Sequence, residues 1–121
     1  MQYATQRAGL LFRALSEPMR LRILHLLRGG ELCVGDLVKA LDVPQPTASR
    51  HLAYLRRARL VSAVKRGLWS FYALAPASTA LHGHLLQAVG ICRRSMPVLG
   101  EDANRLRALK RSGGCCPAAK A

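Results

Sequence analysis

Residues 31–74 read ELCVGDLVKALDVPQPTASRHLAYLRRARLVSAVKRGLWSFYAL and are the most informative part of the chain. Apolar residues recur at helical spacing on both sides of the breaker Asp42-Val43-Pro44, and from Leu60 onward they alternate with polar residues. We therefore predict two helices joined by a turn, followed by a two-stranded β-hairpin. This arrangement is a winged helix-turn-helix, mainly α with a small β-hairpin, and it is typical of proteins that bind DNA.

The second of these helices, residues 45–58, has a core face and a polar face. Its core face repeats at helical spacing: Ala48, Leu52, Leu55 and Ala58. The N-terminal part of its polar face carries groups suited to base edges: Gln45, Thr47, Ser49, Arg50 and His51. The C-terminal part carries cations suited to phosphates: Arg56, Arg57 and Arg59. We expect this helix to enter the major groove.

The predicted hairpin carries positive charge at its tip. Lys65 and Arg66 precede Gly67, a residue that takes the positive φ of a tight turn without strain. Such a tip suits a phosphate backbone or a minor groove. We therefore expect Lys65 and Arg66 to complete the DNA-binding set.

The charge of the whole chain favours the same partner. Nineteen Lys and Arg residues face six Asp and Glu residues, a formal net charge of +13, and no acidic residue lies between Asp42 and Glu101. This charge is not gathered on one amphipathic helix, so double-stranded DNA is favoured over a membrane surface. Arg7 and Arg13 interrupt the apolar start of the chain, and we expect a cytoplasmic protein that is not secreted. No arrangement of residues suggests an enzyme.

Helical patterns flank the winged unit on both sides. Before it we expect a helix over residues 3–15 and a second one, capped by Ser16, that ends at Gly29-Gly30. After it we expect a helix opened by Pro76 and Ser78, and another over residues 101–111.

The apolar faces of the last two helices suggest a second copy of the chain. One carries Leu81, Leu85, Ala88 and Cys92, and the other carries Leu106 and Leu109. A chain of 121 residues buries such faces most economically in a homodimer, whose symmetry also suits a palindromic operator. We expect residues 1–111 to form one DNA-binding and dimerisation domain, and residues 112–121 to form a flexible tail with a cysteine pair.

Four segments together resemble the ArsR/SmtB-type winged-helix repressors, which release DNA on binding a metal or metalloid ion. They are ALSEPMRLRIL at 14–24, ELCVGDL at 31–37, SRHLAYL at 49–55 and GLWSFYAL at 67–74. The resemblance covers about residues 11–74. It implies a dimeric repressor that needs no cofactor to bind DNA.

The resemblance also directs attention to the cysteines, which we expect to be reduced thiols. Many arsenic-responsive members of that family carry two thiols in the motif ELCVCDL, whereas this chain has Gly35 in place of the second. Cys33 alone cannot satisfy a soft trivalent ion that prefers two or three thiolates. We therefore interpret Cys33 as the cap of the helix that starts near Val34.

Cys115 and Cys116 are the natural replacement. Basic neighbours favour their thiolate forms, and the preceding Gly-Gly leaves them free to adjust. Some members of the family resemble this arrangement and sense arsenite, antimonite or methylarsenite through a vicinal pair. We favour Cys92 as a third ligand over Cys33, and either can come from the partner subunit. Coupling to the distant reading helix is then expected to run through the dimer helices.

Two alternatives remain open. Zinc is a competing inducer because His82 and His84 lie near Cys92, but residues two apart face different sides of a helix, and we expect both histidines to be solvated. A thiol redox switch at the C-terminal pair is the other alternative.

Overall fold

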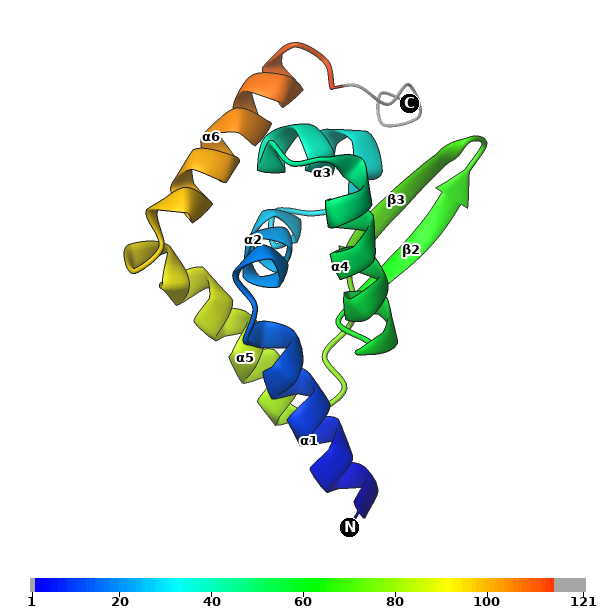
Figure 1. Ribbon diagram of the computed structural model, residues 1–121, viewed down its shortest axis with the longest axis vertical. Helices are drawn as coiled ribbons and strands as arrows, with labels where there is room; N and C mark the ends of the chain where they lie inside the picture. Colours follow the sequence, from blue (N-terminus) through cyan, green and yellow to red (C-terminus); the bar gives the residue numbers. More distant parts are fainter. Residues whose placement is uncertain (1, 115–121) are drawn as a thin grey trace.

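The computed structural model of this chain describes residues 2–114 (Figure 1). Its helices are α1 (Gln2–Leu15), α2 (Pro18–Leu27), α3 (Val34–Leu41), α4 (Gln45–Arg57), α5 (Ala80–Ile91) and α6 (Pro97–Arg111), with the short 3-10 turn η1 (Cys92–Arg94) between the last two. Its strands are β1 (Leu32–Cys33), β2 (Val61–Arg66) and β3 (Trp69–Leu74). The predicted fold class, mainly α with a small hairpin in a winged helix-turn-helix, is confirmed.

The sheet has one strand more than we predicted. The order is β1-β3-β2, and β1 pairs antiparallel with β3 through Leu32↔Tyr72 and Cys33↔Phe71. A strand of two residues is too short to show alternation, so the sequence pattern misses it. It ties the hairpin to the start of α3 and places Cys33 at that junction.

Helix α2 forms the centre of the molecule (Figure 1). Ile23 and Leu24 are completely buried, and α3, α4, α5 and α6 all pack against α2. The predicted core face of α4 is confirmed, since all four of its members are buried: Ala48, Leu52, Leu55 and Ala58. Burial of this face leaves the opposite face of α4 turned to solvent.

Two helices start later than predicted. Glu17, not Ser16, caps α2 and accepts a hydrogen bond from the backbone N–H of Arg20 at 3.0 Å, because Pro18 takes the first helical position. Ser16 instead donates to the carbonyl of Arg13 at the end of α1. Helix α5 was expected to open with Pro76 and Ser78, but Thr79 caps it and it starts at Ala80.

Helix α6 packs within its own chain. It lies mainly along α3 and α2, and Leu106 and Leu109 contact the main core, so the expectation that they face a second copy is wrong. The helix also starts at Pro97, earlier than predicted. Its end is a Schellman motif, in which the N–H of Gly114 donates to the carbonyl of Leu109 at 2.9 Å. The first residues of the expected flexible tail, 112–114, therefore form a hydrogen-bonded cap.

A buried carboxylate joins α6 to the helix-turn-helix. Asp102 is completely buried and accepts two hydrogen bonds from Arg22 at 2.9 Å and one from Arg105 at 2.6 Å. These two arginines also donate to the last carbonyls of α3: Arg22 to Leu41 and Arg105 to Ala40, each at 2.7 Å. The hydrogen bond to Asp102 raises the pKa of Arg22. We call this group of three charged residues the Asp102 clamp.

Within residues 2–114, none of the helices is both long enough and apolar enough to cross a membrane.

Removing the carboxylate tests the clamp. Asp102→Ala should lower the free energy of unfolding by about 3 kcal/mol, because two arginines lose their buried counter-charge. Chemical denaturation followed by circular dichroism measures this change.

The adjacent Glu101 provides the control, since it has the same charge on the same helix and is exposed. Glu101→Ala should change stability by less than about 0.5 kcal/mol. Equal losses in the two variants would mean that the clamp contributes nothing specific.

Candidate nucleic-acid interface and thiol sites

The solvent face of α4 carries the predicted base-reading residues, but not all of them are equally available. Gln45 and Arg50 are exposed, whereas Thr47 and Ser49 are half-buried. The side chain of Arg50 is therefore the cation at this end of α4 that is best placed to reach a base edge.

His51 is held by its own chain. Its Nδ1 lies 3.4 Å from Nη1 of Arg20 and 3.8 Å from Oε2 of Glu17. Burial lowers the pKa of His51, and the neighbouring arginines add to this effect against the opposing charge of Glu17. The ring therefore positions α4 on α2, and it reaches a base only if these contacts break.

Arg20 is a positioning residue that the sequence analysis missed. Its guanidinium lies 4.0 Å from the ring centroid of Tyr54 on α4, and it donates to the carbonyls of Ala14 and Arg13 at the end of α1. One side chain thus joins α1, α2 and α4. The sequence signal was weak, because Arg20 is one of two arginines in a mainly apolar helix.

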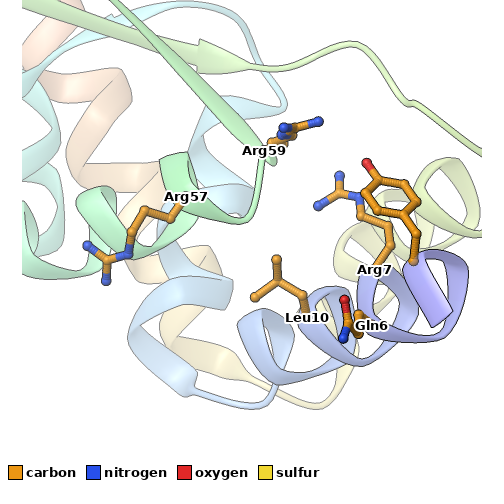
Figure 2. A pocket seen from close by; sticks show the side chains of 6 residues that line it. Gln6, Arg7, Leu10, Arg57 and Arg59 are labelled. Atoms are coloured by element: carbon orange, nitrogen blue, oxygen red, sulfur yellow. The ribbon is translucent and has the colours of Figure 1, made fainter.

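Cations gather at the C-terminal end of α4. Arg56, Arg57 and Arg59 are exposed, and Arg59 adopts the left-handed conformation with φ of 60°. Arg57 and Arg59 line a cleft of about 220 Å³ between α1 and this end of α4, and Figure 2 shows Arg57 pointing away from Arg7. Ala58 is the C-cap residue of α4, and Arg7 donates a hydrogen bond to its carbonyl. The guanidinium groups therefore do not converge on one point, and they suit a series of phosphates better than one small anion.

The two cations at the tip of the wing differ in their contacts. Gly67 has φ of 62° and starts the two-residue turn, as predicted, and Lys65 is exposed. Arg66 instead forms an ion pair with Glu31 at 2.5 Å and lies over the ring of Phe71 at 4.7 Å. Its hydrogen bond to Glu31 raises the pKa of Arg66. A phosphate contact by Arg66 therefore competes with Glu31.

The cysteines differ in oxidation state and in position. Cys33 is almost completely buried, and its sulfur caps α3 by accepting from the N–H of Asp36 at 3.4 Å, as the sequence predicted. This sulfur is disulfide-bonded, so the expectation of a reduced thiol is wrong for Cys33 in this structure. Cys92 is a half-buried free thiol at the end of α5. Cys115 and Cys116 lie outside the described residues.

The histidines do not form a metal site with Cys92. His82 is completely buried and accepts a hydrogen bond from the N–H of Ser78 at 3.2 Å, so the expectation of a solvated ring is wrong for His82. His84 is exposed on another face, as predicted. Between residues 2 and 114 no three His, Cys, Asp or Glu residues come together as metal ligands.

Comparison with known proteins identifies the relatives of this chain. Residues 17–63 match the family described as "Bacterial regulatory protein, arsR family". The arsenical resistance operon repressor of Escherichia coli (strain K12) is 42% identical over 85 residues, which cover 69% of this chain and 73% of that protein. An arsenic resistance transcriptional regulator of Pseudomonas putida is 37% identical, with 80% of this chain and 75% of that protein covered.

Solved structures agree with this comparison. A homodimeric winged helix-turn-helix DNA-binding domain from Mycobacterium bovis superposes with a TM-score of 0.65 at 29% identity, covering 78% of this chain and 87% of that one. The AntR antimony-specific transcriptional repressor superposes with a TM-score of 0.63 at 28% identity, covering 78% and 83%.

The buried His82 generates a prediction about pH. Burial, and then the charge of Arg7, lower the pKa of His82. An unfolded histidine gains a proton as the pH falls through about 6.5, before the folded one does, so the free energy of unfolding should fall between pH 7 and pH 5. His82→Gln should reduce the slope of the free energy of unfolding against pH. The reduction is at most about 1.4 kcal/mol per pH unit, which corresponds to the uptake of one proton on unfolding. Urea titrations at several pH values measure the slope.

His84→Gln is the matched control and should leave the slope as it is, because His84 is exposed. His25 and His51 also have lowered pKa values and should preserve part of the dependence in the His82 variant. An unaltered slope in His82→Gln would contradict the assignment.

Proposed function

This chain belongs to the ArsR family of bacterial regulatory proteins, and on that premise we propose that it is a homodimeric repressor whose cysteines bind trivalent arsenic or antimony and so release its operator. Membership makes it a DNA-binding regulator of transcription. The identity of the inducer is the step we add. The observation that carries it is the cysteine pair Cys115 and Cys116, in a chain whose relatives include arsenical and antimony repressors.

The described surface supports DNA binding by α4. Its core face is buried, and Arg50 and Gln45 project from its first turns while Arg56 and Arg57 project from its last. A helix that can contact base edges with its first turns and phosphates with its last turns suits a major groove. Lys65 at the wing tip extends the contact to the flanking backbone. In a dimer, two copies of α4 meet successive grooves of a palindromic operator in the cytoplasm.

Exposed apolar side chains support dimerisation. Tyr3 and Phe12 on α1 are 69% and 55% exposed, and Ile91 at the end of α5 is 66% exposed. Ala88, from the stripe that the sequence assigned to a dimer face, is exposed as well. Burial of this surface against a second copy is favourable, and the relative from Mycobacterium bovis is homodimeric.

The disulfide at Cys33 favours one second candidate, a repressor that senses oxidation. In that case disulfide formation, and not metalloid binding, changes the affinity for DNA. The two candidates can be distinguished with fully reduced protein, which a metalloid releases from DNA in the first case and an oxidant in the second.

The reading role of α4 can be tested at Arg50. Arg50→Ala should weaken binding to a duplex that the unaltered protein has selected from a random pool, by about 1–3 kcal/mol if Arg50 reads a base. Fluorescence anisotropy of the labelled duplex measures the affinity, and size-exclusion chromatography checks that the dimer persists.

Arg94→Ala is the control, because Arg94 is an exposed arginine on η1, away from α4. The loss in Arg94→Ala should be much smaller at the same salt concentration. If both variants bind as the unaltered protein does, α4 is not the reading helix.

The inducer can be tested at the cysteine pair. Replacing Cys115 and Cys116 together by Ser should abolish release by arsenite and antimonite and keep the affinity for DNA. Anisotropy titrations of the reduced protein with arsenite, antimonite, methylarsenite, zinc and peroxide compare the candidates directly.

Release by peroxide alone would favour the redox candidate, and release by zinc alone would overturn both. A double variant that still responds to arsenite would show that the pair is not the sensor.

A further inference from the structure

We propose that Glu31 competes with DNA phosphate for the guanidinium of Arg66, and that it thereby limits the affinity of the protein for any duplex. This inference rests on the proposed function, because it assumes that the wing lies on the DNA backbone. It assigns Arg66 to an intramolecular ion pair, in place of the phosphate contact that the sequence predicted.

The side chain of Arg66 points away from the tip of the wing. Arg66 is the last residue of β2 and pairs with Trp69, whereas Phe71 lies two residues further along β3 and pairs with Val64. These residues share one face of the hairpin, because side chains two positions apart on a strand point to the same side. The guanidinium lies 4.7 Å from the ring centroid of Phe71, so the side chain folds back along the sheet toward the body of the molecule.

The sheet brings Glu31 to this guanidinium from outside the wing. Glu31 directly precedes β1, which pairs with β3 and places Leu32 opposite Tyr72. Nη1 and Nη2 of Arg66 donate to Oε1 and Oε2 of Glu31 at 2.5 and 3.1 Å, which is a bidentate arrangement. The wing itself, residues 61–74, contains no acidic residue. The carboxylate that neutralises Arg66 therefore comes from a segment 35 residues earlier in the chain.

A DNA phosphate is a direct competitor of this carboxylate. Both groups accept two parallel hydrogen bonds from one guanidinium, so Arg66 pairs with one or with the other. The exchange leaves no buried charge behind, because the side chains of Arg66 and Glu31 are 46% and 37% exposed. The hydrogen bond from Arg66 lowers the pKa of Glu31, so the competing carboxylate is ionised at neutral pH.

Lys65 lies outside this competition. Adjacent residues of a strand point to opposite faces of the sheet, so Lys65 is on the face away from Arg66, and it is exposed. Each subunit therefore presents one cation at the wing and withholds another. A withheld cation releases no counterions from DNA, so the ion pair lowers both the affinity and its dependence on salt.

The test is Glu31→Gln in the full-length, reduced protein without inducer. Glutamine keeps the shape of the side chain and removes its charge, so Arg66 becomes available to the backbone. The plot of log affinity against log salt concentration should steepen by about 0.9 per subunit, or about 1.8 for a dimer. The affinity at low salt should rise at least about threefold, on the selected duplex and on an unrelated one, because phosphates carry no sequence information. Fluorescence anisotropy measures both quantities.

Glu101→Gln is the matched control, because it removes the same charge from an exposed residue on α6. It should leave the slope of the salt plot as it is. Equal changes in the two variants would show that Glu31 acts only through the net charge, and the inference would be wrong.

Arg66→Gln identifies the group that Glu31 withholds. By itself this change should leave the slope nearly unaltered, because Arg66 is already paired within the chain. Combined with Glu31→Gln, it should abolish the gain in affinity. A gain that persists in the double variant, or a clearly shallower slope in Arg66→Gln alone, would overturn the inference.

Lys65→Gln separates this inference from the proposed function. It should make the slope shallower by about 0.9 per subunit, because it removes a phosphate contact of the wing. If it does so while Glu31→Gln behaves like its control, the role of Glu31 is wrong and the placement of the wing on DNA stands. If neither Lys65→Gln nor Glu31→Gln changes the slope, that part of the proposed function fails as well.

Discussion

One buried carboxylate sets the position of the C-terminal third of the molecule. Asp102 has no exposed surface, and the cost of burying its charge is met by a bidentate hydrogen bond from Arg22 and a further bond from Arg105. Because the same arginines satisfy the last carbonyls of α3, which have no partner inside the helix, α6 cannot shift without leaving charges and carbonyls unpaired. The clamp therefore fixes α6 along the first helix of the helix-turn-helix.

This fixed position also determines where the C-terminal end of α6 lies. Helix α6 runs from the clamp to its Schellman cap, and the cap brings Gly114 against Asp36 at the start of α3. The residues that follow Gly114 carry the cysteine pair. A charge interaction at the C-terminal end of α3 thereby also determines what packs against its N-terminal end.

The DNA-binding surface shows that charge alone overstates the number of available cations. Arg20 and His51 secure α4 on α2, and Arg66 pairs with Glu31 beneath the wing. Arg50 and Lys65 are exposed and are the better candidates for DNA contacts. Arg20 helps to position α4 through His51 and Tyr54, whereas the exposed and unpaired cations are the ones we propose for contact with a polyanion.

The winged helix-turn-helix, the core face of α4 and the cap of α3 by Cys33 could all be predicted from the sequence, because they depend on local periodicity and on residues a few positions apart. It missed the strand β1, which is too short for a pattern, and it misplaced the apolar face of α6. The roles of Arg20, Asp102 and Gly114 could not be predicted and become visible in the folded chain. Each acts through a partner 30 or more residues away or on another element, and a single sequence does not encode such a contact as a spacing.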